Sequence, residues 1–252
     1  MIWLRSALFN LWFYSVTVLV ALLSVAVQLG PPAWLRALAR GWARVVLGGL
    51  KAICGITVTV TGREHLPQGG AALIASQHQS AFDTVVWLLL VPDATYVLKR
   101  ELTRIPLYGA ICRKLGMIAV DRAGGASAIR ALLRDGNAAV AEGRQIVIFP
   151  EGTRAPPGAP LPLHPGVAAL AARTGLPVVP VVTDSGRRWG RRAFRKEPGI
   201  IHVAIQPPLP ARLPRSELMA RLAELYAAGV VPVDNSVGAP LSGFTTNPRK
   251  AI

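Results

Sequence analysis

The chain has 252 residues, enough for one α/β domain, or one domain with an anchor, that buries a full core without disulfides. Its two cysteines, Cys54 and Cys112, cannot build a disulfide framework or a zinc site, and its four histidines lack metal-ligand spacing, so we expect no metal. The net charge of +15 indicates a polyanionic partner, which could be nucleic acid, an anionic membrane or a phosphorylated substrate.

An uncharged run at residues 7–29 predicts a long apolar helix. At 1.5 Å rise per residue it would be roughly 34 Å long, enough to cross the core of a bilayer. A secretory signal peptide is the first rival interpretation, because SVA resembles a cleavage site, but the apolar run exceeds the usual length of such a signal. A buried core helix fits less well, because the run is apolar on every face. We therefore expect a membrane anchor here.

A Gly-Pro-Pro turn at 30–32 ends this helix, and a second helix of different character is expected at about 34–53. Arg36, Arg40 and Arg44 recur there every four residues among apolar side chains, a pattern typical of a basic amphipathic helix in the headgroup plane of a membrane. The alternative is an ordinary surface helix of the following domain. The two helices could also form a re-entrant hairpin, which the sequence does not distinguish from a span.

From residue 56 onward, short β-branched runs alternate with helical patterns. The expected strands are 56–61, 72–75, 95–98, 117–120, 146–149, 178–182 and 201–206. The expected helices are 84–91, about 102–115, 126–142, 166–174 and 215–229. This alternation predicts an α/β fold with a mostly parallel sheet flanked by helices. We therefore divide the chain into an N-terminal membrane anchor at 1–54, an α/β domain at 55–230 and an irregular C-terminal tail at 231–252.

The hexapeptide HQSAFD begins at His78 and ends at Asp83, directly before the apolar run of a predicted helix. Residues five apart on a straight helix point about 140° away from each other, so the two side chains can meet only if His78 lies in the loop. Ser80 is a suitable N-cap for that helix. Asp83 would then hold one ring nitrogen of His78 and leave the other free as a base. Alternatively, Ser80 and Asp83 form only a capping box and His78 is an ordinary loop histidine.

Further chemically active residues follow two other predicted strands. Lys99 and Arg100 come after TYVL, and the turn after IVIF carries Glu151, Gly152, Thr153 and Arg154. Ligands of α/β sheets gather at the carboxyl ends of the strands, so these residues are expected to lie near His78. Taken alone, EGTR is typical of a solvated turn.

Taken together, these stretches are more specific, and they resemble the glycerolipid acyltransferase family over about residues 50–210. The resemblance rests on HQSAFD, KRELTRIPLYG (99–109), FPEGTR (149–154) and VVPVV (178–182) in this order. Within the family, the likeness is to the enzymes that acylate 1-acylglycerol 3-phosphate. The chain departs from the family pattern at Gln77, where Asn is common, and at His164, where a basic residue is common before Pro-Gly.

The resemblance implies transfer of a fatty acyl group from acyl-CoA or acyl carrier protein to the free hydroxyl of 1-acylglycerol 3-phosphate (lysophosphatidic acid), giving phosphatidic acid. His78 would be the general base and Asp83 would fix its tautomer. A thioester is already activated, so neither a metal nor a covalent intermediate is needed. Lys99 and Arg154 would receive the acceptor phosphate. The substrate-binding residues implied are Lys99, Arg100, Glu151, Gly152, Thr153 and Arg154.

Other functions fit the sequence less well. A member of the same family with another lysolipid acceptor is the first alternative. A non-enzymatic basic module that binds membranes or nucleic acid is the second, supported by six cations in the ten residues 187–196, but such a module has no need of the His78–Asp83 pair. We expect no nucleic-acid partner. The sequence has no G-x-S-x-G elbow of a serine hydrolase, and neither a Walker A loop nor a G-x-G-x-x-G fingerprint, so we expect no cofactor.

The expected location follows from the donor. Thioester donors are cytosolic, so we expect the bacterial inner membrane with the catalytic domain on its cytoplasmic face. The arginines just after the apolar run agree with this orientation, because cations favour the cytoplasmic side. An anionic membrane surface is the expected partner of those arginines.

Overall fold

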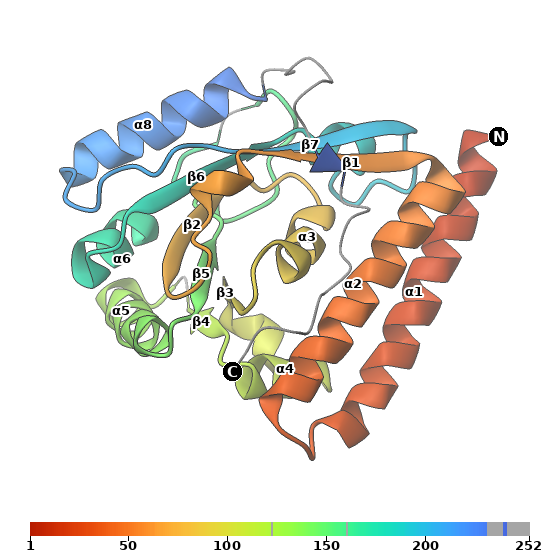
Figure 1. The fold of residues 1–252 in the computed structure, drawn as a ribbon, viewed down its shortest axis with the longest axis horizontal. Coiled ribbons are helices and arrows are strands. Elements are labelled where there is room, and N and C mark those ends of the chain that lie inside the picture. Colours follow the sequence, from red (N-terminus) through yellow and green to blue (C-terminus); the bar gives the residue numbers. More distant parts are fainter. Residues whose placement is uncertain (122, 160, 231–238, 241–252) are drawn as a thin grey trace.

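The computed structural model of the chain describes residues 1–121, 123–159, 161–230 and 239–240. Two long antiparallel helices, α1 (Ile2–Val27) and α2 (Pro32–Cys54), run side by side along one flank of the molecule (Figure 1). α2 begins at a proline, which is tolerated because the first N–H groups of a helix have no partner within it. It ends at Gly55, whose φ of 67° lies in the left-handed region that favours glycine.

The described residues form a sheet of eight strands in the order β4-β3-β5-β2-β6-β7-β1-β8. The strands are β1 (Ile56–Thr61), β2 (Ala72–Ser76), β3 (Ala94–Lys99), β4 (Ile118–Val120), β5 (Gln145–Ile148), β6 (Val178–Thr183), β7 (Gly199–Ile205) and β8 (Ala239–Pro240). Neighbouring strands are parallel except for β6 with β7 and β1 with β8. The predicted mostly parallel sheet is confirmed, and all seven predicted strands are present.

The remaining helices connect these strands. They are α3 (Phe82–Leu90), α4 (Tyr108–Lys114), α5 (Gly125–Ala141), α6 (Gly166–Thr174), α7 (Ser185–Arg188), α8 (Arg215–Ala228) and the 3₁₀ turns η1 (Arg63–His65) and η2 (Arg100–Arg104). The single helix expected at 102–115 is wrong. Pro106 interrupts it, because proline cannot donate a helical hydrogen bond, and η2 and α4 stand on either side of the break. The predicted tail at 231–252 lies outside the described residues, apart from 239–240 in β8.

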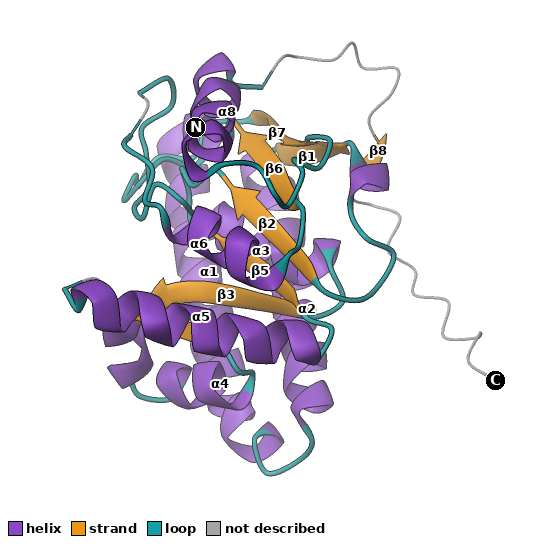
Figure 2. Cartoon of the chain, turned by 90° about the vertical axis from the view of Figure 1, so that its left-hand side faces the viewer, coloured by secondary structure: helices purple, strands orange, loops and turns teal. Residues whose placement is uncertain are grey.

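Helices cover both faces of the sheet and divide the core in two. Successive side chains of a strand point to opposite faces, and β2 shows this with Leu73 and Ile74. Ile74 belongs to the core under α1, α2 and α3, and Leu73 to the core under α5, α6 and α8. Figure 1 shows these two groups of helices on opposite sides of the strands, and in Figure 2 α5 crosses in front of β3. The prediction of a sheet flanked by helices is confirmed.

α2 packs on the α/β domain through its arginines. The Arg36 Nε lies 2.7 Å from the Asp93 Oδ1, and Arg40 donates to the carbonyl of Pro92, both in the loop before β3. Two of the three arginines expected to face lipid headgroups therefore also bind the α/β domain.

α1 is bonded to the rest of the chain at both of its ends. Near its start, the Arg5 Nε donates to the carbonyl of Ile53 at 2.6 Å, and the Ser6 Oγ accepts the Lys196 N–H at 2.9 Å. Just past its end, the carbonyl of Gln28 accepts a hydrogen bond from Lys114 of α4. Among the described residues α1 is the one helix long and apolar enough to cross a membrane, yet it lies along the domain instead of projecting from it.

Candidate active site

The loop that carries His78 connects β2 to α3. α3 begins at Phe82, and its N-cap is Ala81, not Ser80 as expected. Ser80 still takes part in a reciprocal arrangement: its Oγ accepts the Phe82 N–H at 3.1 Å, while its own N–H donates to the Asp83 Oδ2 at 2.7 Å. The difference is one residue, and these bonds make the entrance of the helix rigid.

His78 lies in this loop and Asp83 in the first turn of α3, as the five-residue spacing requires. The Asp83 Oδ2 is 3.1 Å from the His78 Nδ1 and also accepts the N–H of Gln79 at 2.6 Å. An ionised carboxylate can only accept, so in the neutral imidazole Nδ1 carries the proton and Nε2 has the free lone pair. The imidazole stacks on Phe149, with 4.3 Å between ring centroids, which fixes the plane of the ring.

The turn after β5 holds the His78 backbone from behind. The His78 N–H donates to the Glu151 Oε2 at 2.6 Å, and the His78 carbonyl accepts the Ala155 N–H at 2.7 Å. Gly152 has a φ of 66°, which this tight turn needs and most side chains disfavour. Burial raises the pKa of the Glu151 carboxyl from 4.5 to about 8, with nearby Asp83 adding to the rise and the His78 N–H opposing it. The two sequence motifs therefore form one structural unit.

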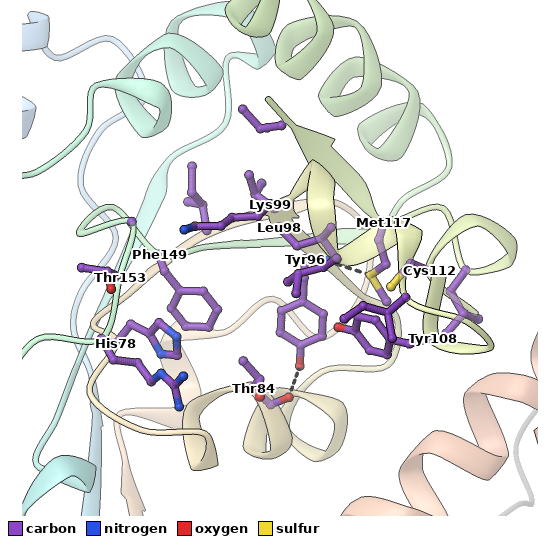
Figure 3. A pocket seen from close by; sticks show the side chains of 18 of the residues that line it. His78, Thr84, Tyr96, Leu98, Lys99, Tyr108, Cys112, Met117, Phe149 and Thr153 are labelled. Atoms are coloured by element: carbon purple, nitrogen blue, oxygen red, sulfur yellow. Dashed lines mark hydrogen bonds between the residues drawn. The ribbon is translucent and has the colours of Figure 1, made fainter. Parts of the chain in front are cut away.

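A cavity of about 1010 Å³ opens beside His78. Figure 3 shows His78, Phe149 and Thr153 at one end of it and Tyr108, Cys112 and Met117 at the other. Its wall is mostly apolar and comes from β3, β4, η2, α4 and α5, with α1 and α2 closing another side. Such a wall suits a hydrocarbon chain, whereas the His78 end suits polar chemistry.

Two of the cations on the wall of this cavity stand at the ends of adjacent strands. Lys99 ends β3 and Arg154 follows β5, and the two strands pair directly. This matches the expected placing at neighbouring strand ends. Two positively charged side chains in one partly apolar cavity can bind a phosphate.

The structure does not bring all the predicted site residues together. His78, Lys99, Gly152, Thr153 and Arg154 line the cavity, with Asp83 directly behind His78. Arg100 does not line it: its side chain is 61% exposed and lies 3.5 Å from the Asp121 carboxylate. Glu151 is also absent from the wall, because this residue is 4% exposed and its carboxylate points to the His78 backbone.

Sequence reasoning missed the two glutamines that flank His78. The Gln77 Oε1 accepts the Thr183 N–H at 3.2 Å, and the Gln79 Oε1 accepts the Gly186 N–H at 3.1 Å. They fasten the loop to β6 and α7 on the side away from β5. Their position on either side of a candidate base could have marked them as residues that hold the loop, but nothing in the sequence identifies their hydrogen-bond partners.

Comparison with known proteins gives consistent results. Residues 57–184 match the family described as Acyltransferase. The chain is 31% identical to a 1-acyl-sn-glycerol-3-phosphate acyltransferase of Pseudomonas aeruginosa over 217 residues, which are 86% of this chain and 84% of that protein. It is 32% identical to an enzyme of the same name from Limnanthes douglasii, over 65% of this chain and 59% of the relative.

The fold is also that of a solved structure. The crystal structure of the 1-acyl-sn-glycerophosphate (LPA) acyltransferase PlsC from Thermotoga maritima superimposes with a TM-score of 0.74. The match covers 90% of this chain and 95% of that one, at 23% sequence identity. At this identity the likeness establishes the fold alone.

Proposed function

The chain belongs to the acyltransferase family, and we propose that it transfers a fatty acyl group from a thioester donor to the free hydroxyl of 1-acylglycerol 3-phosphate, giving phosphatidic acid. The relatives named for this activity support the choice of acceptor. The single observation that carries the proposal is the His78–Asp83 pair beside an apolar cavity that also holds Lys99 and Arg154.

In this reaction His78 is the general base. Its Nε2 takes the proton of the acceptor hydroxyl while the oxygen attacks the thioester carbonyl, and Asp83 stabilises the imidazolium that forms. The carbon–sulfur bond then breaks, and the imidazolium returns the proton to the departing thiolate. Burial among Phe149 and the apolar wall supports this role, because bulk water would compete with the acceptor hydroxyl.

Lys99 and Arg154 bind the acceptor phosphate. Each charge-assisted hydrogen bond contributes about 1.5–3 kcal/mol to binding. Thr153 lies beside His78 and offers a hydroxyl to the same substrate, and Gly152 lets the backbone approach it. Glu151 positions the His78 backbone, and Arg100 pairs with Asp121 outside the wall of the cavity.

The apolar helix α1 supports association with a membrane. We propose that residues 1–54 are the anchor, that residues 55–230 are the catalytic domain, and that the protein works at the bacterial inner membrane with this domain on the cytoplasmic face. Both ends of α1 are bonded to the domain, which favours a hairpin in one leaflet over a span. Protease added to sealed right-side-out membranes should leave the domain intact, and its rapid digestion would contradict the orientation.

The proposed reaction is tested by offering the purified protein in detergent an acyl-CoA donor with a panel of lysolipid acceptors. We expect 1-acylglycerol 3-phosphate to give the highest kcat/KM. Lys99→Met or Arg154→Met should raise the KM for that acceptor about tenfold or more. Arg100→Met is the matched control, because this cation lies outside the cavity, and its KM should stay near the wild-type value.

Two other results of this assay would contradict the proposed acceptor or the proposed reaction. A higher kcat/KM for an acceptor without a phosphate monoester would identify another lysolipid as the substrate. No transfer to any acceptor would contradict the proposed function itself.

A further inference from the structure

Two arginines that the acceptor site does not use also line the cavity. Arg191 and Arg192 belong to the segment Trp189–Lys196, called here the basic loop, which follows α7. Both side chains are exposed, and both lie on the wall of the cavity that holds His78. Two of the six cations of the cluster expected from the sequence therefore line the same cavity as His78.

A buried lysine gives the basic loop its shape. Lys196 is 2% exposed, and its Nζ donates to the carbonyls of Ala193 at 2.7 Å and Phe194 at 2.9 Å. It also lies 5.5 Å from the centre of the Trp189 ring, a cation–π distance. An ordinary solvated run of cations has no such internal anchor. Arg192 has a φ of 54°, unusual for a residue with a side chain, so the loop holds this arginine in a specified backbone conformation.

The basic loop is tied to elements on both of its sides. Lys196 also donates to the Asn10 Oδ1 at 3.1 Å, which connects the loop to α1. At the other side, Gly186 of α7 donates to Gln79, the neighbour of His78. The position of the loop relative to His78 is therefore fixed by contacts within the chain.

The order of the strands separates the two pairs of cations. β2 leads to His78, β5 and β3 lie to one side of it, and β6 lies to the other. Lys99 and Arg154 follow β3 and β5, whereas the basic loop follows β6. The reaction uses two anionic substrates, which meet at one base, so the cavity needs two places for phosphates.

We propose that Arg191 and Arg192 bind the phosphates at the carrier end of the acyl donor, on the opposite side of His78 from the acceptor phosphate. The assignment rests on the proposed acyl transfer. In acyl-CoA a diphosphate and a further phosphate follow the pantetheine arm, so the thioester can reach His78 while the phosphates stay at the exposed rim. Arginine suits this task, because its planar guanidinium binds phosphate oxygens in pairs.

The test compares two donors with the same acyl chain, acyl-CoA and the acyl thioester of pantetheine, which has no phosphate. In the double variant Arg191→Gln, Arg192→Gln, the KM for acyl-CoA should rise roughly tenfold. The KM for the pantetheine thioester and that for 1-acylglycerol 3-phosphate should each change less than about twofold. Lysine at both positions keeps the charge but not the paired hydrogen bonds, so it should recover only part of the lost affinity.

The matched control is Arg195→Gln. Arg195 belongs to the same loop, pairs with Glu197 at 3.1 Å and does not line the cavity, so the KM for acyl-CoA should stay near the wild-type value. A tenfold rise in this control as well would mean that the general charge of the loop matters, and would overturn the assignment to two arginines.

A phospholipid headgroup is the other source of a phosphate near α1. Co-sedimentation with vesicles of phosphatidylglycerol and phosphatidylcholine separates the two: the double variant should bind them like the wild type. Loss of vesicle binding with an unchanged donor KM would overturn the proposal, as would a raised KM for the acceptor. Wild-type turnover is the reference, and its absence would contradict the proposed function and this assignment together.

Discussion

The molecule contains two His–Asp pairs of nearly equal geometry. The His78 Nδ1 lies 3.1 Å from Asp83, and the His202 Nδ1 lies 2.9 Å from Asp184. In both pairs an aspartate oxygen also accepts a backbone N–H. The pairs differ in what surrounds the second ring nitrogen. His78 lines the large cavity, whereas His202 stands on β7, away from it.

The comparison shows that pairing alone does not make a catalytic histidine. Asp184 follows β6 and binds both the backbone and the ring of His202, so this pair fastens two antiparallel strands together. Asp83 instead binds the ring from behind and leaves Nε2 toward a space where a substrate fits. The cavity, not the hydrogen-bond distance, distinguishes the two.

Replacing each histidine in turn by alanine should give the largest difference in kcat between the two pairs. We expect His78→Ala to lower kcat by about 10³-fold, within the range that a positioned general base contributes. His202→Ala should leave kcat within about twofold and lower the free energy of unfolding by about 1 kcal/mol, the worth of a partly buried hydrogen bond. Initial rates and thermal unfolding in detergent measure both. Equal losses of kcat in the two variants would show that a position on the cavity wall is not what makes a histidine catalytic here.

The aspartates should repeat this contrast on a smaller scale. Asp83→Asn removes the charge that stabilises the imidazolium, so kcat should fall roughly 10²-fold while the KM for the acceptor stays similar. Asp184→Asn keeps a carbonyl oxygen for the His202 ring and should change kcat by less than about twofold. If Asp184→Asn lowered kcat as much as Asp83→Asn does, the substitution would have to displace the His78 loop through α7 and its hydrogen bond to Gln79.

Sequence reasoning could find the first pair and not the second. His78 and Asp83 are separated by four residues and flank a helix start, so local geometry alone limits how they meet. Asp184 and His202 meet only because β6 and β7 pair antiparallel in one register, which periodicity does not specify. The same reasoning predicted every long strand, since β-branched runs are a local signal. It also predicted a continuous helix at 102–115, because it did not weigh Pro106.

The directions in which the side chains of the site point also could not be predicted from the sequence. Motif position placed Glu151 and Arg100 with the substrate, but a turn can direct neighbouring side chains to opposite sides. Glu151 points inward to His78 and Arg100 outward to Asp121, while Arg154 lines the cavity. The packing of α1 was equally hidden. Its uniform hydrophobicity predicts an anchor but gives no sign that Ser6 and Phe9 are fully buried against the domain.

The two pairs also differ in the number of carboxylates that bind the histidine. Asp184 accepts both the backbone and the ring N–H of His202, whereas at His78 the ring binds Asp83 and the backbone binds Glu151. Two carboxylates so close repel each other when both are ionised. Burial, the larger cause, and this repulsion raise the pKa of Glu151 to about 8, so Glu151 is mostly neutral at pH 7.

Glu151→Gln therefore tests the smallest of these effects. The folded state holds the Glu151 proton up to about pH 8, and the unfolded chain releases it near pH 4.5, so this group stabilises the fold at low pH and the contribution is lost as pH rises between those values. We expect the wild-type free energy of unfolding in detergent to fall by on the order of 4 kcal/mol from pH 5 to pH 8.5 through this group. Glutamine keeps an oxygen for the His78 N–H but cannot titrate, so the variant should lack that loss and keep kcat within about fivefold at pH 7. Thermal unfolding of both proteins across this pH range measures the difference between the two slopes. The same slope in Glu151→Gln would show that the carboxyl is ionised in the folded protein, and that two charged carboxylates hold His78.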